Sequence, residues 1–135
     1  MDALAVWIYP RSPSERVPAA TAEIVVRAPR ISATVTDPGK VARIVRWFDA
    51  LPVSPPGVAV SCPYAVAPDL TLSFRSAGGA RLAQATLPRT EATLCDPIAF
   101  TIGGWRRRPL IDGPGESFVR RLQGLLGLRL VQARR

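Results

Sequence analysis

The sequence predicts an α+β domain in which a single antiparallel β-sheet has two helices packed on one face. Several short segments alternate apolar and polar residues with a period of two, as strands with one buried face do. Two Gly-Gly pairs, at positions 78–79 and 103–104, separate such segments and predict tight hairpins, which make neighbouring strands antiparallel. Two longer segments carry the apolar spacing of amphipathic helices.

The size and composition of the chain suit one domain with a buried core. It has 135 residues, of which 47% are hydrophobic, and no apolar run is long enough for a transmembrane helix. Residues 1–21 are expected to be an N-terminal segment and a Pro/Ser-rich linker, because "PRSPSERVPAAT" is rich in proline, serine and charge. Residues 22–135 are expected to form the single α+β domain.

The first half of this domain is predicted to be two strands followed by a helix. Ala22–Pro29 is rich in β-branched residues, and Arg30–Asp37 alternates apolar with polar side chains. A helix follows, since Asp37 can cap it and Pro38 suits the first helical position. Pro52 ends this helix.

The second half is predicted to contain two hairpins and a closing helix. "LTLSFR" and "RLAQATL" flank the first Gly-Gly pair, and Ile98–Ile102 and "WRRRPLI" flank the second. The closing helix lies in "GPGESFVRRLQGLLG", with Gly127 as its natural end, and "LRLV" is expected to be a last short strand. The main order is therefore β–β–α–β–β–β–β–α.

Several kinds of catalytic and metal site are excluded by composition. The chain has no histidine, so it cannot build a Ser-His-Asp triad, a Cys-His pair or a His-containing zinc site. Neither of the glycine-rich nucleotide-binding motifs occurs. We expect no enzyme activity, no cofactor and no metal; a carboxylate enzyme would need two of the scattered acids to converge. Those acids are Asp69, Glu91, Asp96, Asp112 and Glu116.

The segment "GGWRRRP" is the sharpest candidate for a binding site in a chain of net charge +8. Arg106, Arg107 and Arg108 could bind phosphates while Trp105 stacks on a base, which makes a cytosolic nucleic-acid-binding module the alternative function. On a strand, however, Trp105 and Arg107 face one way and the other two arginines face the opposite way. Because Pro109 favours an edge, we expect an exposed edge strand whose arginines add little to stability.

The stretch from "DPGKVARIVRWFDALP" through a loop ending in Cys62-Pro63 to "LTLSFR" resembles uncharacterised exported proteins of high-GC bacteria, many of them lipoproteins. Their shared pattern continues with a hairpin, a second lone cysteine and a closing helix, and here that cysteine is Cys95. The resemblance covers roughly residues 36–127 and carries no known activity. It implies that Cys62 and Cys95 form a disulfide, and two buried free thiols are the alternative.

The expected function is that of a non-enzymatic, exported or envelope-associated domain that binds a protein or a cell-surface ligand. Its expected location is extracellular or the cell envelope, with the cytoplasm as the alternative. The apolar stretch from Ala3 to Tyr9 lacks a basic flank and is a poor signal peptide. An exported chain would therefore begin after a removed leader.

Overall fold

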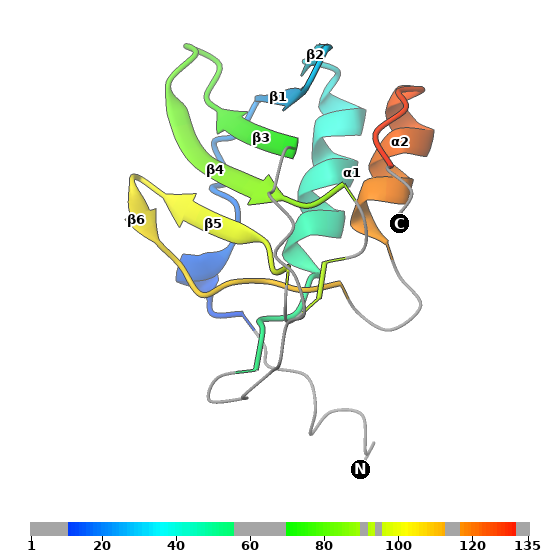
Figure 1. The fold of residues 1–135 in the computed structure, drawn as a ribbon. Coiled ribbons are helices and arrows are strands. Elements are labelled where there is room, and N and C mark those ends of the chain that lie inside the picture. Colours follow the sequence, from blue (N-terminus) through cyan, green and yellow to red (C-terminus); the bar gives the residue numbers. More distant parts are fainter. Residues whose placement is uncertain (1–10, 56–69, 90–91, 94–95, 113–116, 132–135) are drawn as a thin grey trace.

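One six-stranded antiparallel sheet forms the centre of the molecule, in the strand order β2-β1-β3-β4-β5-β6 (Figure 1). The computed structural model describes residues 11–55, 70–89, 92–93, 96–112 and 117–131. Within them the strands are β1 (Glu23–Ala28), β2 (Ile31–Val35), β3 (Leu70–Arg75), β4 (Arg81–Leu87), β5 (Ala99–Ile102) and β6 (Trp105–Arg106). The helices are α1 (Pro38–Asp49) and α2 (Phe118–Leu126), and a short 3₁₀ helix, η2 (Pro13–Glu15), precedes the sheet. The predicted fold class and element order are confirmed.

The turns between strands follow the local sequence to different degrees. The β3–β4 connection spans residues 76–80, with Gly79 at a φ of 87°, so it is longer than the tight turn predicted for Gly78 and Gly79. Gly103 and Gly104 have φ values of 58° and 82°, as the two central residues of a type I′ hairpin require. This turn pairs Ile102 with Trp105. The hairpin between β1 and β2 uses Pro29 and Arg30 instead, and Arg30 takes the left-handed conformation at φ 64°.

The start of α1 and the end of α2 lie where the sequence predicts. The Asp37 side chain accepts a hydrogen bond from the Lys40 amide at 3.0 Å, so it caps α1. Gly127 ends α2 with φ 67°. Residues 128–131, however, form no strand, so the expectation of a short strand there is wrong. The Gln123 side chain accepts from the amides of residues 130 and 131 at 2.9 Å each, so a side chain occupies amides that a partner strand would bind.

A cluster of aromatic rings fills the core between the sheet and the helices. Phe48 of α1 lies 5.3 Å from Phe74, 4.9 Å from Phe100 and 5.6 Å from Phe118, measured between ring centroids. These are all four phenylalanines of the chain. They come from α1, β3, β5 and α2, and both helices lie on one side of the sheet (Figure 1). The opposite face of the sheet is therefore left without helices in the described structure.

The segment that the sequence predicts to be a linker is part of the packed structure from Arg11 onward. Arg11, Glu15 and Val17 are all buried, and Val17 belongs to the hydrophobic core. The Val17 amide donates to the Asp49 carboxylate at 2.9 Å, and the Ala22 amide donates to the Arg75 carbonyl at 2.8 Å. These contacts correct the expectation of a linker over residues 11–21.

Candidate functional site

The basic hairpin does not gather its three arginines into one patch. β6 ends at Arg106, which pairs with Thr101 and shares the outer, helix-free face of the sheet. Arg107 continues the chain with its amide donating to the Phe100 carbonyl at 2.8 Å. Trp105 is 75% exposed, as expected for an edge strand. The two-residue alternation predicted for this segment therefore stops before Arg107 and Arg108.

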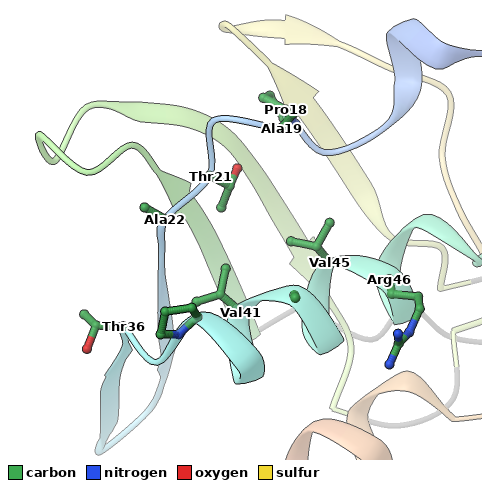
Figure 2. A pocket seen from close by; sticks show the side chains of 10 residues that line it. Pro18, Ala19, Thr21, Ala22, Thr36, Val41, Val45 and Arg46 are labelled. Carbon is green, nitrogen blue, oxygen red and sulfur yellow. The ribbon is translucent and has the colours of Figure 1, made fainter.

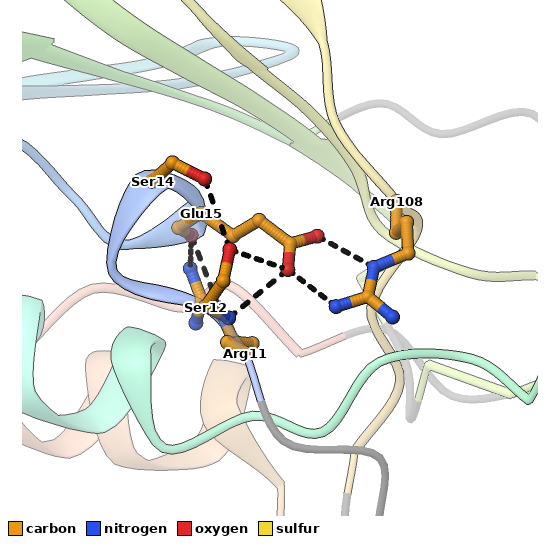
Figure 3. Close-up of polar contacts among 5 residues, drawn as sticks. All are labelled: Arg11, Ser12, Ser14, Glu15 and Arg108. Atoms are coloured by element: carbon orange, nitrogen blue, oxygen red, sulfur yellow. Dashed lines mark hydrogen bonds and ion pairs between the residues drawn. The ribbon is translucent and has the colours of Figure 1, made fainter.

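Arg108 is bound to Glu15 rather than displayed to solvent partners. Its Nε donates to Glu15 Oε2 at 2.7 Å, and its Nη2 bonds to the other carboxylate oxygen (Figure 3). Such a two-point contact between guanidinium and carboxylate is among the stronger polar contacts in proteins. The interpretation that all three arginines merely solubilise an edge is therefore wrong for Arg108.

Arg11 fixes the other side of the same 3₁₀ segment. Its guanidinium donates twice to the Glu15 carbonyl, at 3.2 and 2.6 Å, and once to the carbonyl of Phe48 near the end of α1. It forms an ion pair with Asp49 at 3.3 Å. The guanidinium carbon also lies 5.2 Å from the Phe48 ring centroid and 5.4 Å from that of Phe100.

The pKa shifts in this cluster have their causes in contacts within the protein. The hydrogen bond from Arg108 is the main cause that lowers the pKa of Glu15, from an ordinary 4.5 to about 2. Burial lowers the pKa of Arg11 and raises the pKa of Asp49, and the attraction between these two groups opposes both shifts. Each charged group is held by protein partners, so we assign the cluster to folding and not to ligand binding.

One sequence signal could have located this cluster. Ser12 and Glu15 have the S-x-x-E spacing of a capping box, with Pro13 at the first helical position. The Ser12 amide does donate to the Glu15 carboxylate, at 3.1 Å (Figure 3). The high proline and serine content of the segment favoured the interpretation as a linker over this signal. No local pattern indicates that Arg108 is the ion-pair partner of Glu15.

Of the other residues singled out in the sequence, the structure describes Asp96 and Asp112, and each is held by contacts within the chain. Cys62 and Cys95 lie outside the described residues, as do Asp69, Glu91 and Glu116. Asp112 is buried, and its two oxygens accept from the amides of Ala92 and Phe118, at 2.9 and 3.0 Å. Asp112 therefore lies near the start of α2. Asp96 is also buried, in a local turn with Thr93.

A groove beside α1 is a hollow that could receive a ligand. Its volume is about 550 Å³ (Figure 2). Val41 and Val45 point into it from α1, and the segment 18–22 forms the opposite wall (Figure 2). Small or apolar residues make up most of the lining: Pro18, Ala19, Thr21, Ala22, Thr36, Pro38, Val41, Ala42, Val45 and Arg46.

The groove exists because the segment 18–22 is anchored at both ends and not in the middle. Val17 holds one end through its contact with Asp49, and Ala22 holds the other end through the Arg75 carbonyl. Between these anchors the chain makes a turn, closed by a hydrogen bond of 3.1 Å from the Thr21 amide to the Pro18 carbonyl. The small side chain of Ala42 on α1 leaves the space beneath the turn open.

One polar group in the groove lining lacks a hydrogen-bond partner. The hydroxyl oxygen of Thr21 is buried and forms no hydrogen bond with any part of the chain that the structure describes. Leaving a buried hydroxyl unpaired costs stability, so such groups are uncommon unless something else satisfies them. Thr21 lines the groove, so a rotation of its side chain about the Cα–Cβ bond would turn this hydroxyl toward a ligand.

A row of cations runs along the exposed side of α1. Lys40, Arg43 and Arg46 are spaced three residues apart and are all exposed, and Arg46 also lines the groove. Spacing of three places neighbouring side chains within reach of each other on a helix. Within this row Arg46 lines the groove, whereas Lys40 lines a separate hollow beside β2, so Arg46 is the cation placed at the edge of the groove.

Comparison with known proteins adds no family to this description. No protein-family model, no curated protein and no solved structure matches the chain. In the described part of the chain, neither helix has the length and apolar character needed to cross a membrane. The candidate site therefore rests on the geometry of the groove.

Proposed function

We propose that this chain is a non-enzymatic binding domain that holds an acidic, extended segment of another protein in the groove beside α1. The observation that carries this proposal is the groove itself, with a volume of about 550 Å³ and a mainly small, apolar lining. Ligand sites are typically concave and apolar, with a few polar groups that fix orientation. Here the Thr21 hydroxyl is the polar group that orients the occupant.

The charge of the occupant is inferred from the border of the groove. Arg46 at the edge of the groove, with Arg43 one turn earlier on α1, favours carboxylates beside the apolar contact, and the positive net charge attracts acidic partners at a distance. The resemblance to exported bacterial proteins supports an extracellular or envelope location for this binding. The disulfide between Cys62 and Cys95 belongs to the same proposal.

The outer face of the sheet is less suited to single-stranded nucleic acid, the alternative partner. Sheets that bind single strands stack bases on exposed aromatic side chains. On the described strands this face carries residues such as Ser73, Gln84 and Thr101 and no aromatic side chain. Trp105 pairs with Ile102, which packs against the core on the other face.

Selection from a library of random displayed peptides tests the proposed function. We expect the wild-type chain to enrich peptides that combine apolar residues with Asp or Glu. Ala42→Trp fills the groove from an exposed helix position and should abolish their binding. Ala20→Trp is the matched control, because Ala20 is exposed in the same turn but does not line the groove.

Further variants separate the contributions of charge and polar anchor. The double variant Arg43→Glu, Arg46→Glu should lower the affinity for the selected peptides at least tenfold and reduce the salt dependence of their binding. Thr21→Val should lower the affinity for these peptides while it keeps the shape of the groove. Peptides that bind Ala42→Trp as well as the wild-type chain would refute the proposal, as would tight salt-dependent binding of mixed oligonucleotides with no peptide enrichment.

A further inference from the structure

The two edges of the sheet differ in how they are protected against pairing with another strand. β6, at one edge, has only two residues, and arginines and Pro109 follow it. Short length, charge and proline are the usual means of blocking an edge. β2, at the opposite edge, has five residues, "ISATV", without a charge or a proline (Figure 1). Its register with β1 runs without a bulge.

The hairpin geometry decides which backbone groups of β2 face outward. β1 and β2 are joined by a two-residue turn, with Ala28 and Ile31 as the last pair. Residues that flank such a turn exchange hydrogen bonds, and bonded and non-bonded pairs then alternate along the ladder. The backbone groups of Ser32 and Thr34 therefore point away from β1, toward the open edge.

We propose that β2 pairs with β2 of a second copy of this chain, antiparallel, about a twofold axis that passes through Ala33. In this register Ser32 of each copy exchanges hydrogen bonds with Thr34 of the other, which uses the outward backbone groups. Ala33 faces its own counterpart, and Ile31 faces Val35. The two sheets become one continuous sheet, a closed contact between identical surfaces.

The side chains on the helix side of β2 complement this register. Val35 is buried, and Ile31 is half-buried against the core. A pocket of about 300 Å³ lies at this edge, lined by residues 33–37, Lys40, Leu126 and Leu128. Placing Ile31 of the second copy opposite Val35 brings its side chain to this pocket. The half-buried Leu126 and Leu128 extend the apolar contact.

Charge complementarity at the ends of the strand favours a second copy as the occupant. Arg30 precedes β2 and Asp37 follows it, and both are exposed. The antiparallel register places Arg30 of one copy opposite Thr36 of the other, beside Asp37, and the twofold axis repeats this contact. The twofold axis therefore pairs apolar groups with apolar groups and positive charges with negative charges, so the surface is complementary to itself.

Light scattering and sedimentation over a series of concentrations, at physiological ionic strength, measure the association. The salt screens the long-range repulsion between two positively charged copies. We expect a concentration-dependent dimer for the wild-type chain. Thr34→Pro removes an outward amide from each copy and no amide of the β1 ladder, so it should lower the association constant roughly 30-fold, as two lost hydrogen bonds of typical strength imply. Thr34→Val keeps the amide and should keep the dimer.

Cross-linking tests the register independently of any loss of folding. Facing residues of a non-bonded antiparallel pair have Cα atoms about 4.5 Å apart, within the range that a disulfide spans. Under mild oxidation, Ala33→Cys should therefore form a disulfide between the two introduced thiols, identified by peptide mapping against the oxidised wild-type chain. Ser32→Cys should not cross-link, since Ser32 meets Thr34 and not its own counterpart.

Three results would overturn the dimer. The first is a wild-type chain that stays monomeric at every concentration. This includes the case in which its β2 edge pairs with a strand of a different protein and not with a second copy. The second is a dimer that Thr34→Pro leaves at wild-type strength while circular dichroism shows an unchanged fold. The third is cross-linking of Ser32→Cys as efficient as that of Ala33→Cys.

Discussion

At the scale of single residues, one residue has an unfavourable backbone conformation and another has an unfavourably buried polar group. Arg30 has a φ of 64° in the β1–β2 turn, where a Cβ atom collides with the neighbouring carbonyl. Thr21 buries a hydroxyl without a hydrogen-bond partner among the described residues. Both lie beside surfaces that we assign to binding, and unfavourable local features concentrate at functional sites.

Replacing Arg30 with glycine should stabilise the fold. Glycine adopts positive φ without a steric cost, and this gain exceeds the entropy that it adds to the unfolded chain. We expect Arg30→Gly to raise the free energy of unfolding by about 0.5–1 kcal/mol. Denaturant unfolding at low protein concentration measures this without a contribution from association, and a drop in stability would contradict the strained turn.

Replacing Thr21 with valine should also stabilise the unliganded protein, although we expect it to weaken peptide binding. The two side chains have nearly the same shape, so the main effect is removal of a buried, unpaired hydroxyl. We expect a gain of roughly 1 kcal/mol in the free energy of unfolding. A loss of stability would show that the hydroxyl is satisfied in the free protein and is not available to a ligand.

At the scale of elements, η2 has its place only because other elements hold it. A 3₁₀ turn of three residues has no stability of its own. The Arg11 guanidinium donates both to the Glu15 carbonyl, the last of η2, and to the Phe48 carbonyl near the end of α1. Arg108, which follows β6, donates to the Glu15 side chain. This contact joins residues 93 positions apart in the chain. The anchored η2 in turn carries Val17, which fixes one end of the groove wall.

Arg108 and Arg106 are a matched pair for testing this contact. Arg108→Met should lower the free energy of unfolding by about 1 kcal/mol, the upper range for a partly exposed ion pair. Arg106→Met, two residues earlier on the same hairpin and without an ion pair among the described residues, should change it by no more than a few tenths. Equal effects of the two substitutions would contradict the role of the Glu15 contact.

The pH dependence of stability should report the same contact. The pKa of Glu15 is about 2 in the folded protein and near 4.5 when the group is free. A lowered carboxyl pKa stabilises the fold above pH 4.5, and this contribution disappears as the pH falls toward 2. The stability difference between the wild-type chain and Glu15→Gln should shrink across this window. A difference that stays constant from pH 5 to pH 2 would refute the shift.

At the scale of the whole molecule, the phenylalanine cluster joins both helices to the sheet. Phe48 contacts the rings of Phe74, Phe100 and Phe118, so it links elements from every part of the domain. Trp105 contrasts with it, since it is large and apolar but 75% exposed at the sheet edge. Stability should therefore depend on the first residue and not on the second.

Alanine substitutions at these two positions should differ sharply in their effect. Phe48→Ala should cost about 3–5 kcal/mol because it leaves a cavity at the centre of the core. Trp105→Ala should change the free energy of unfolding by less than about 0.5 kcal/mol. Thermal or denaturant unfolding measures both, and a large loss with Trp105→Ala would show that the indole packs against the domain.

The sequence by itself determined the six strands and the two α-helices of this protein. Strands, helices, caps and glycine turns depend on residues near one another in the chain, so their periods and capping residues can be read directly. β3 and β4 occupy the residues predicted for them, and Asp37 and Gly127 mark helix ends as expected. The absence of histidine likewise excluded whole classes of catalytic site.

Only the tertiary structure decided which distant residues meet. Nothing local to "WRRRP" distinguishes Arg108, which binds Glu15, from Arg106, which lies on the outer face. The groove beside α1 and the open edge at β2 likewise depend on how the segment 18–22 and the strands are placed in space. Local periodicity carries information about neighbours in sequence, whereas these sites form between segments joined only by packing.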